Sequence, residues 1–200
     1  LRQVENPYFE KIFKERNAML RHRKRAARKY NNKIKILFLS EPIYSHAMNS
    51  YKDPYRWGYT EYEMLRDLQR LMELKADIEV KIRLHPAEEE DKYSKFINKK
   101  LISITTSSNS SLVKDCVSSD IIIGSDTMGL ITGWILGKKV ISYIPSAKKT
   151  CSLPQKEIVK IKSFNALTHE IETFKRDTRV KIRGNHIIFS KAFLNFFKGK

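Results

Sequence analysis

The residues of this sequence best suited to chemistry stand directly after two apolar segments. His85 follows the segment 78–84 (IEVKIRL), and the small polar residues 125–127 follow a second segment, 120–124 (DIIIG). An imidazole can give a hydrogen bond or a charge to a phosphate. Backbone N–H groups at the start of a helix bind phosphate, helped by the helix dipole. These residue types predict a site for a phosphorylated ligand such as a nucleotide.

Similar side chains follow the other apolar segments, and together they define the candidate site. His85 is also the candidate catalytic residue, and Pro86 fixes the backbone beside it. Ser125 and Thr127 can add hydroxyl donors to the backbone donors around them. The candidate nucleotide-binding residues are Ser40, Glu41, His85, Pro86, Thr105, Gly124, Ser125, Asp126 and Thr127.

Each candidate has an ordinary structural alternative, which the sequence leaves open. His85 could be a loop histidine without a ligand, Asp126 a helix cap, and Glu41 a surface residue. The polar run 107–111 is more often a capping turn than a site. Geometry is needed to decide between these interpretations.

Several common motifs are missing from the sequence. The stretch 124–129 (GSDTMG) lacks the G-x-G-x-x-G spacing, and no G-K-[ST] is present, so neither NAD nor a P-loop triphosphate is predicted. There is no Asp-x-Asp motif. The two cysteines, Cys116 and Cys151, cannot form a four-ligand zinc site on their own. We therefore expect no metal and no bound cofactor.

Strands and helices that alternate along the chain must position these residues. The patterning predicts strands over 33–40, 78–84, 101–105, 120–124 and 139–144, with a weaker strand over 158–161. Helices are expected over 7–30, after Thr60 with a capping box to Glu63, over 88–98, from 112, from Ser125 or Asp126 to Gly137, from Ser163, and over 189–197. This order predicts a doubly wound α/β fold with a mostly parallel sheet.

In such a fold, ligands bind at the carboxyl ends of the strands, which is where the candidate residues stand. The stretch 41–58 is rich in Tyr, Pro, Asn and Ser and is expected to be a loop. Its Trp57 is a candidate substrate contact, whereas Trp134 lies in an apolar helix and is expected in the core.

The composition indicates one domain with a basic appendage. The chain has 200 residues and 39 Lys and Arg against 22 Asp and Glu, a net charge of +17. We expect an amino-terminal basic helix over 1–32 and a Rossmann-like domain over 33–200. The densest basic run, 21–29 (RHRKRAARK), is either a contact for phosphates or an anionic membrane surface, or a solvated helix face.

Other features restrict the classes of protein. Aromatic residues do not alternate with this basic run and no zinc-finger spacing occurs, which disfavours specific nucleic-acid recognition. No apolar run approaches the ~18 residues of a membrane-spanning helix, and no secretory signal begins the chain. The two thiols suit a reducing compartment, so we expect a cytoplasmic protein, peripheral to the membrane if the basic run binds lipid. The chain opens with Leu1, from which we expect a piece of a longer protein.

Two segments together resemble a known family. They are 82–86 (IRLHP), a strand running into His-Pro, and 121–145 (IIIGSDTMGLITGWILGKKVISYIP), a strand, a hydroxyl-rich turn and a helix. The pair resembles the carboxyl-terminal, donor-binding half of GT-B-type glycosyltransferases, of the bacterial polysialyltransferase and CDP-glycerol glycerophosphotransferase kind. The resemblance implies that His85 contacts the nucleotide of a nucleotide-sugar donor. It also implies that Ser125 and Thr127 hold the donor phosphate.

The resemblance also implies an activity and its requirements. We expect a transferase that moves a sugar from a nucleotide-sugar donor to a glycan or cell-surface polymer, inverting and independent of metal. A second half-domain or a partner chain would bind the acceptor, because 200 residues cannot hold both halves. No Asp or Glu occurs over 128–141, which disfavours a 2-epimerase or a retaining transferase. The alternative function is a non-catalytic basic α/β module that binds nucleic acid or another anionic polymer.

Overall fold

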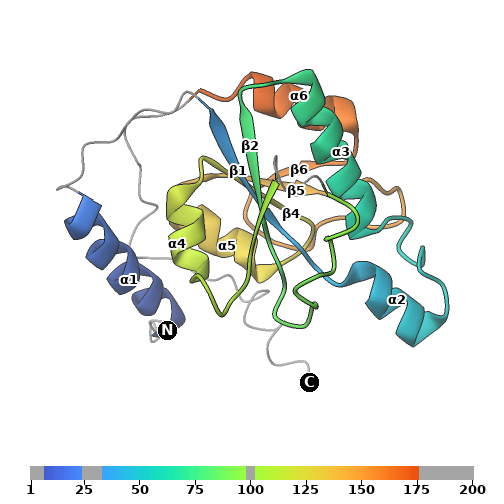
Figure 1. Ribbon diagram of the computed structural model, residues 1–200, viewed down its shortest axis with the longest axis horizontal. Coiled ribbons are helices and arrows are strands. Elements are labelled where there is room, and N and C mark those ends of the chain that lie inside the picture. Colours follow the sequence, from blue (N-terminus) through green and yellow to red (C-terminus); the bar gives the residue numbers. More distant parts are fainter. Residues whose placement is uncertain (1–6, 24–32, 98–101, 176–200) are drawn as a thin grey trace.

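One sheet of six parallel strands forms the centre of the computed structural model, which describes residues 7–23, 33–97 and 102–175 (Figure 1). The strand order is β3-β2-β1-β4-β5-β6, and every neighbouring pair is parallel. The strands are β1 (Ile34–Leu39), β2 (Ile78–Arg83), β3 (Ile102–Thr105), β4 (Ile121–Gly124), β5 (Lys139–Tyr143) and β6 (Val159–Ile161). The predicted doubly wound α/β fold is confirmed, and the ends of each strand differ from the predicted ones by at most one residue.

Helices cover both faces of the sheet. In Figure 1, α4 and α5 lie on one face with α1 outside them, and α3 and α6 lie together on the other face. Across the α3–α6 contact, the Arg70 guanidinium lies 4.3 Å from the ring centroid of Phe164. The helices of the described residues are α1 (Pro7–Arg23), α2 (Ile43–Tyr51), α3 (Glu61–Leu74), α4 (Leu112–Ser118), α5 (Met128–Ile135) and α6 (Phe164–Glu172).

The core lies on both sides of the two central strands. Every residue of β4 is buried, and Leu37 and Phe38 of β1 are fully buried. Short, continuous apolar runs of this kind suit parallel strands covered on both faces. Strand β2, which lies between β1 and β3, alternates buried and partly buried residues instead. The carboxyl ends of β1 and β4 are therefore the part of the sheet best supported by the core, which suits them to position a site.

The capping signals in the sequence explain where three helices begin. Thr60 and Glu63 form the predicted capping box of α3, and the Thr60 N–H donates to Glu63 Oε2 over 2.8 Å. Ser111 caps α4 and Ser163 caps α6, each by accepting from a backbone N–H two or three residues into the helix. The run 107–111 is therefore a capping turn.

Three expectations about the elements are wrong. The stretch 41–58 is not all loop, because 43–51 forms α2, which buries Ile43 and Ala47 one turn apart. The stretch 88–98 is not a helix. Over 88–97 it forms successive turns, because Glu88 and Lys92 are drawn into a buried ion-pair cluster. Helix α5 starts at Met128 with Thr127 as its cap, not at Ser125 or Asp126, since both of those bond elsewhere.

The amino-terminal helix packs onto the domain. Ile12 of α1 is 2% exposed, and Glu15 accepts a hydrogen bond from the Ser111 hydroxyl at the start of α4. The Tyr8 hydroxyl lies 3.2 Å from Thr132 Oγ1 of α5. Residues 24–29 of the basic run and the predicted helix 189–197 lie outside the described residues. Among the residues that are described, no helix is long and apolar enough to cross a membrane.

Candidate functional site

The strand order places a topological switch between β1 and β4. From β1 the sheet grows through β2 and β3 on one side and through β4, β5 and β6 on the other. The connections that leave β1 and β4 therefore turn to opposite faces of the sheet, and the carboxyl ends of two such strands are the usual ligand position in this fold class. Ser40 and Glu41 leave β1 here, and 125–127 leave β4.

Glu41 is bound by the donors that sequence reasoning assigned to a phosphate. Its Oε1 accepts from the N–H groups of Ser125 and Asp126, both over 3.2 Å, and from the Ser125 hydroxyl. Burial raises the pKa of the Glu41 carboxyl, while the hydrogen bonds from Ser125 and Asp126 oppose that rise. The turn after β4 is thus suited to an anion, and in this structure the anion is a carboxylate of the same chain.

The rest of this turn is fixed by its neighbours. Asp126 Oδ1 accepts from the N–H and the hydroxyl of Ser152, over 2.8 and 3.0 Å, so Asp126 holds a later loop and caps no helix. Thr127 Oγ1 accepts from the Gly129 N–H at the start of α5. Gly124 is buried, and a Cβ there would lie 3.2 Å from the Thr127 side chain. Little free volume surrounds this turn.

Ser40 belongs to a second polar cluster beside the first. Its hydroxyl donates to Glu88 Oε1 over 2.8 Å and lies 2.5 Å from the Tyr93 hydroxyl. Lys92 lies between two carboxylates, Glu88 at 2.5 Å and Glu61, and each of those side chains is 1% exposed. Burial also raises the pKa of Tyr93. The cluster ties the end of β1 to the loop that leaves β2.

His85 lies on that loop, exposed to solvent. Its backbone N–H donates to Glu88 Oε2 over 2.8 Å, and its Nδ1 accepts from the Ala87 N–H over 3.2 Å. A neutral imidazole whose Nδ1 accepts carries its proton on Nε2. Nε2–H is therefore the donor that His85 can offer to a ligand, and the neighbouring Pro86 is exposed as well.

Glu88 is the functional residue that sequence reasoning missed. It connects Ser40 to the backbone of His85, so it aligns two candidate residues from different strands. Its position three residues after His85, with a proline between them, is the spacing of a capping carboxylate. That spacing was the signal available in the sequence.

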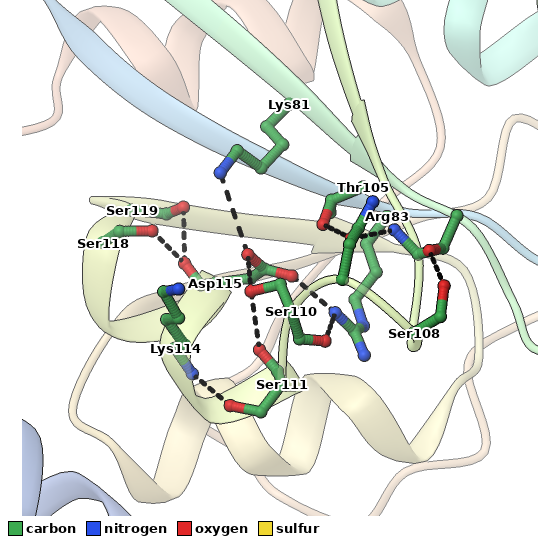
Figure 2. A network of polar contacts seen from close by, with 12 residues as sticks. Lys81, Arg83, Thr105, Ser108, Ser110, Ser111, Lys114, Asp115, Ser118 and Ser119 are labelled. Atoms are coloured by element: carbon green, nitrogen blue, oxygen red, sulfur yellow. Dashed lines mark hydrogen bonds and ion pairs between the residues drawn. The ribbon is translucent and has the colours of Figure 1, made fainter.

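Thr105 is not part of this group. Its hydroxyl donates to Asn109 Oδ1 over 2.8 Å, within its own turn. Figure 2 shows the network beyond it, where Asp115 receives Arg83 at 2.5 Å and the Ser110 hydroxyl at 2.8 Å. Asp115 is buried, and its two carboxylate oxygens accept from the Ser110 hydroxyl and from Arg83, so this network fastens α4 to β2.

The structure thus brings together seven of the nine candidate residues, in two adjoining groups. One group is Glu41, Gly124, Ser125, Asp126 and Thr127, and the other joins Ser40 to the His85 loop. Pro86 lies on that loop without a polar role, and Thr105 lies apart. Among the described residues, no three His, Cys, Asp or Glu side chains converge as metal ligands would.

Comparisons with known proteins give matches of structure only. The sequence matches no protein-family model and no curated protein. The fold is similar to two Thermosulfurimonas dismutans structures. One is KpsC, beta Kdo 2,4 transferase, with 15% identity and a TM-score of 0.39 over 70% of this chain and 46% of that one. The other is KpsC, beta Kdo 2,7 transferase, with 18% identity and a TM-score of 0.38 over 83% of this chain and 52% of that one. The chain therefore spans about half the length of each.

Proposed function

We propose that this chain is the nucleotide-sugar-binding domain of a glycosyltransferase that acts on a glycan or cell-surface polymer. One observation carries the proposal. Glu41 and Ser125 meet at the β1–β4 switch point, and the adjoining cluster places the loop of His85 beside them. A ligand with a phosphate and a ring to recognise fits this mixture of backbone donors, hydroxyls and one imidazole.

In the proposed reaction an acceptor hydroxyl attacks the anomeric carbon of the donor as the bond to the nucleotide phosphate breaks. The chain would contribute by positioning the donor and by stabilising negative charge on the leaving phosphate. His85 would donate through Nε2–H, and the N–H groups of Ser125 and Asp126 would donate once Glu41 has moved aside. Another half-domain or a partner chain would hold the acceptor and supply the general base. The proposal includes inversion, independence of metal, and a cytoplasmic site of action close to a membrane.

Calorimetric titration with CMP, CDP, UDP and their sugar conjugates tests this function. We expect saturable binding of one nucleotide, little affected by salt and weakened about tenfold or more in His85→Ala, since a lost charge-assisted hydrogen bond costs about 1.5–3 kcal/mol. His169→Ala is the matched control, because His169 is exposed on α6, away from the carboxyl ends of β1 and β4. Failure of every nucleotide to bind would exclude the proposal.

The net charge of +17 favours one alternative, a non-catalytic module for nucleic acid or another anionic polymer. That function requires affinity that falls steeply with salt and does not depend on His85. Titration with single-stranded RNA and with anionic vesicles, at low and high salt, separates it from the proposed function.

A further inference from the structure

Helix α2 lies beyond the carboxyl end of β1 (Figure 1), and one of its faces carries exposed aromatic side chains. Tyr44, Met48 and Tyr51 recur at helical spacing and are 41%, 40% and 51% exposed, and Tyr55 after the helix is 51% exposed. A neighbouring face of α2 packs into the domain through Ile43 and Ala47. Contiguous exposed apolar surface of this kind usually marks a binding site.

Cations accompany these rings. The Arg56 guanidinium lies 5.1 Å from the centroid of the Tyr51 ring. Lys149 Nζ lies 5.8 Å from the centroid of the Trp57 ring and also forms an ion pair with Asp126 Oδ2 at 3.6 Å. Over 42–60 and 146–150 the chain carries four Lys and Arg, at 52, 56, 148 and 149, against one Asp at 53. The face therefore combines flat apolar rings with positive charge.

The face is held in shape before any ligand arrives. Trp57 packs on His46, with ring centroids 5.4 Å apart, and on Tyr51, with centroids 5.9 Å apart. The Ser146 hydroxyl donates to the Trp57 carbonyl over 2.6 Å. Gly58 has φ +76°, and a Cβ there would lie 2.6 Å from Ser146 Oγ, so the close approach of the two segments requires glycine. A preformed face loses less entropy when it binds.

We propose that this face binds an anionic carbohydrate chain, with sugar rings on Tyr51, Tyr55 and Trp57 and acidic groups on Arg56 and Lys149. Aromatic faces pack against the C–H faces of sugars, and the cations complement carboxylates or phosphates. The proposal rests on the proposed function, because a chain bound there would be a distal part of the acceptor, whose reacting end is held by another half-domain or a partner chain. Helix α2 starts two residues after Glu41, and Lys149 pairs with Asp126 of the turn after β4, so a glycan on this face can reach the β1–β4 switch point.

Two other occupants fit the face less well. Three of its four most exposed large side chains are tyrosines with polar hydroxyl groups, and Met48 is the one aliphatic residue among them, which suits lipid hydrocarbon poorly. The rings of Tyr51 and Trp57 stand at 83° to each other, which gives no pair of parallel faces for successive stacked bases.

The fluorescence of Trp57 provides the test. The whole chain is titrated with oligogalacturonate, a hyaluronan oligosaccharide and a poly(glycerol phosphate) oligomer, and with maltohexaose as the neutral counterpart. We expect an emission change with at least one anionic glycan and a much smaller one with maltohexaose. Trp57→Phe should abolish the change, since Trp134 then provides the remaining emission.

Two variants locate the binding. Tyr51→Ala and Arg56→Ala should each weaken it about tenfold, the usual loss for one strong contact. Arg66→Ala, an equal loss of charge at an exposed position on α3, should leave it within about twofold. Affinities that are equal in all three variants overturn the proposal, as does the absence of a response to every anionic glycan.

Different results overturn the glycan-binding proposal and the nucleotide-binding proposal. Nucleotide binding without glycan binding overturns the glycan-binding face and leaves the donor site standing. Tighter binding of poly(U) RNA, or of vesicles with anionic lipid, than of every glycan also overturns it and identifies the other occupant.

Discussion

At the scale of single residues, Glu41 is the feature that most changes how the site is understood. A carboxylate held by Ser125 and Asp126 competes with any phosphate for the same donors. Because burial raises the pKa of Glu41, its carboxylate is protonated at a higher pH than the carboxylate of an exposed glutamate would be. Protonation removes the negative charge that competes with the phosphate.

Binding of a nucleotide sugar should therefore depend on the charge of Glu41. Affinity should rise as the pH falls through the raised pKa of Glu41. In Glu41→Gln it should be higher at neutral pH and should vary less with pH, because the like charge is gone. Calorimetry between about pH 5 and about pH 8 measures this, in the range above the reference pKa of about 4.3 for glutamate. A nucleotide sugar is used because its phosphoryl charge stays constant there. Glu73→Gln, at an exposed position on α3, should behave as the unmodified chain. Unchanged pH dependence in Glu41→Gln would contradict the competition.

The same residue should affect stability, with a sign fixed by linkage. A carboxyl group with a raised pKa in the folded state stabilises the fold most below its unfolded pKa. That contribution is lost as the pH rises through the folded pKa. Relative to Glu41→Gln, the unmodified chain should thus lose melting temperature as the pH rises across this window. Thermal unfolding followed by circular dichroism measures it, and a difference of the opposite sign would contradict the raised pKa.

At the scale of elements, the turns over 84–97 depend on Glu88. Its carboxylate is 1% exposed and contacts Ser40, Lys92 and the N–H of His85. Glu88→Ala should lower the free energy of unfolding by about 2–4 kcal/mol, because it removes one of the two carboxylates that hold the buried Lys92 and the acceptor of the Ser40 hydroxyl and the His85 N–H. The exposed neighbour Glu89→Ala should stay within about 0.5 kcal/mol. Urea denaturation compares the two, and equal effects would show that Glu88 is not structural.

Helix α1 should likewise behave as part of the packed domain. Ile12 is 2% exposed, so Ile12→Ala should cost about 2–4 kcal/mol of unfolding free energy through lost contacts and a cavity. Lys11→Ala on the exposed side of α1 is the control, with an expected change of under about 0.5 kcal/mol. A small effect of Ile12→Ala would mean that α1 is an independent appendage. The boundary at residue 32 stays a prediction.

The sequence predicted best what depends on nearby residues. Apolar runs located all six strands, and the Thr60–Glu63 box located the start of α3. The stretch over 88–98 misled because its charged residues favour a helix locally, whereas Lys92 pairs with Glu61, 31 residues away. Helix α2 was hidden by the turn-forming residues around Ile43 and Ala47.

For the candidate site, too, the sequence predicted local features but not long-range contacts. The order of apolar runs, read with the switch-point rule, was enough to place Ser40, Glu41 and Ser125 at one edge of the sheet. The hydrogen-bond partners of these residues could not be predicted, because the Glu41–Ser125 contact spans 84 positions of sequence. Such a contact depends on the register of β1 against β4, which no local pattern encodes.

At the scale of the whole molecule, protection should decrease from the centre of the sheet to its edges. β1 and β4 are paired on both sides and covered on both faces, whereas β6 is a three-residue edge strand. In hydrogen exchange followed by mass spectrometry, we expect peptides from 34–39 and 121–124 to exchange last, and peptides from 159–161 much earlier. Equal rates would mean that the sheet opens as a single unit.

The order of the strands also bears on synthesis. As the chain leaves the ribosome, β1 emerges before the other strands of the sheet, but its second neighbour β4 starts at Ile121 and follows only after β2 and β3 have been made. Until then one edge of a strand whose Leu37 and Phe38 end fully buried has no partner. The newborn chain therefore passes through a stage in which an apolar central strand is open to other chains, and the switch point between β1 and β4 does not yet exist. Binding at that switch point thus belongs to chains that have been translated past Asp126.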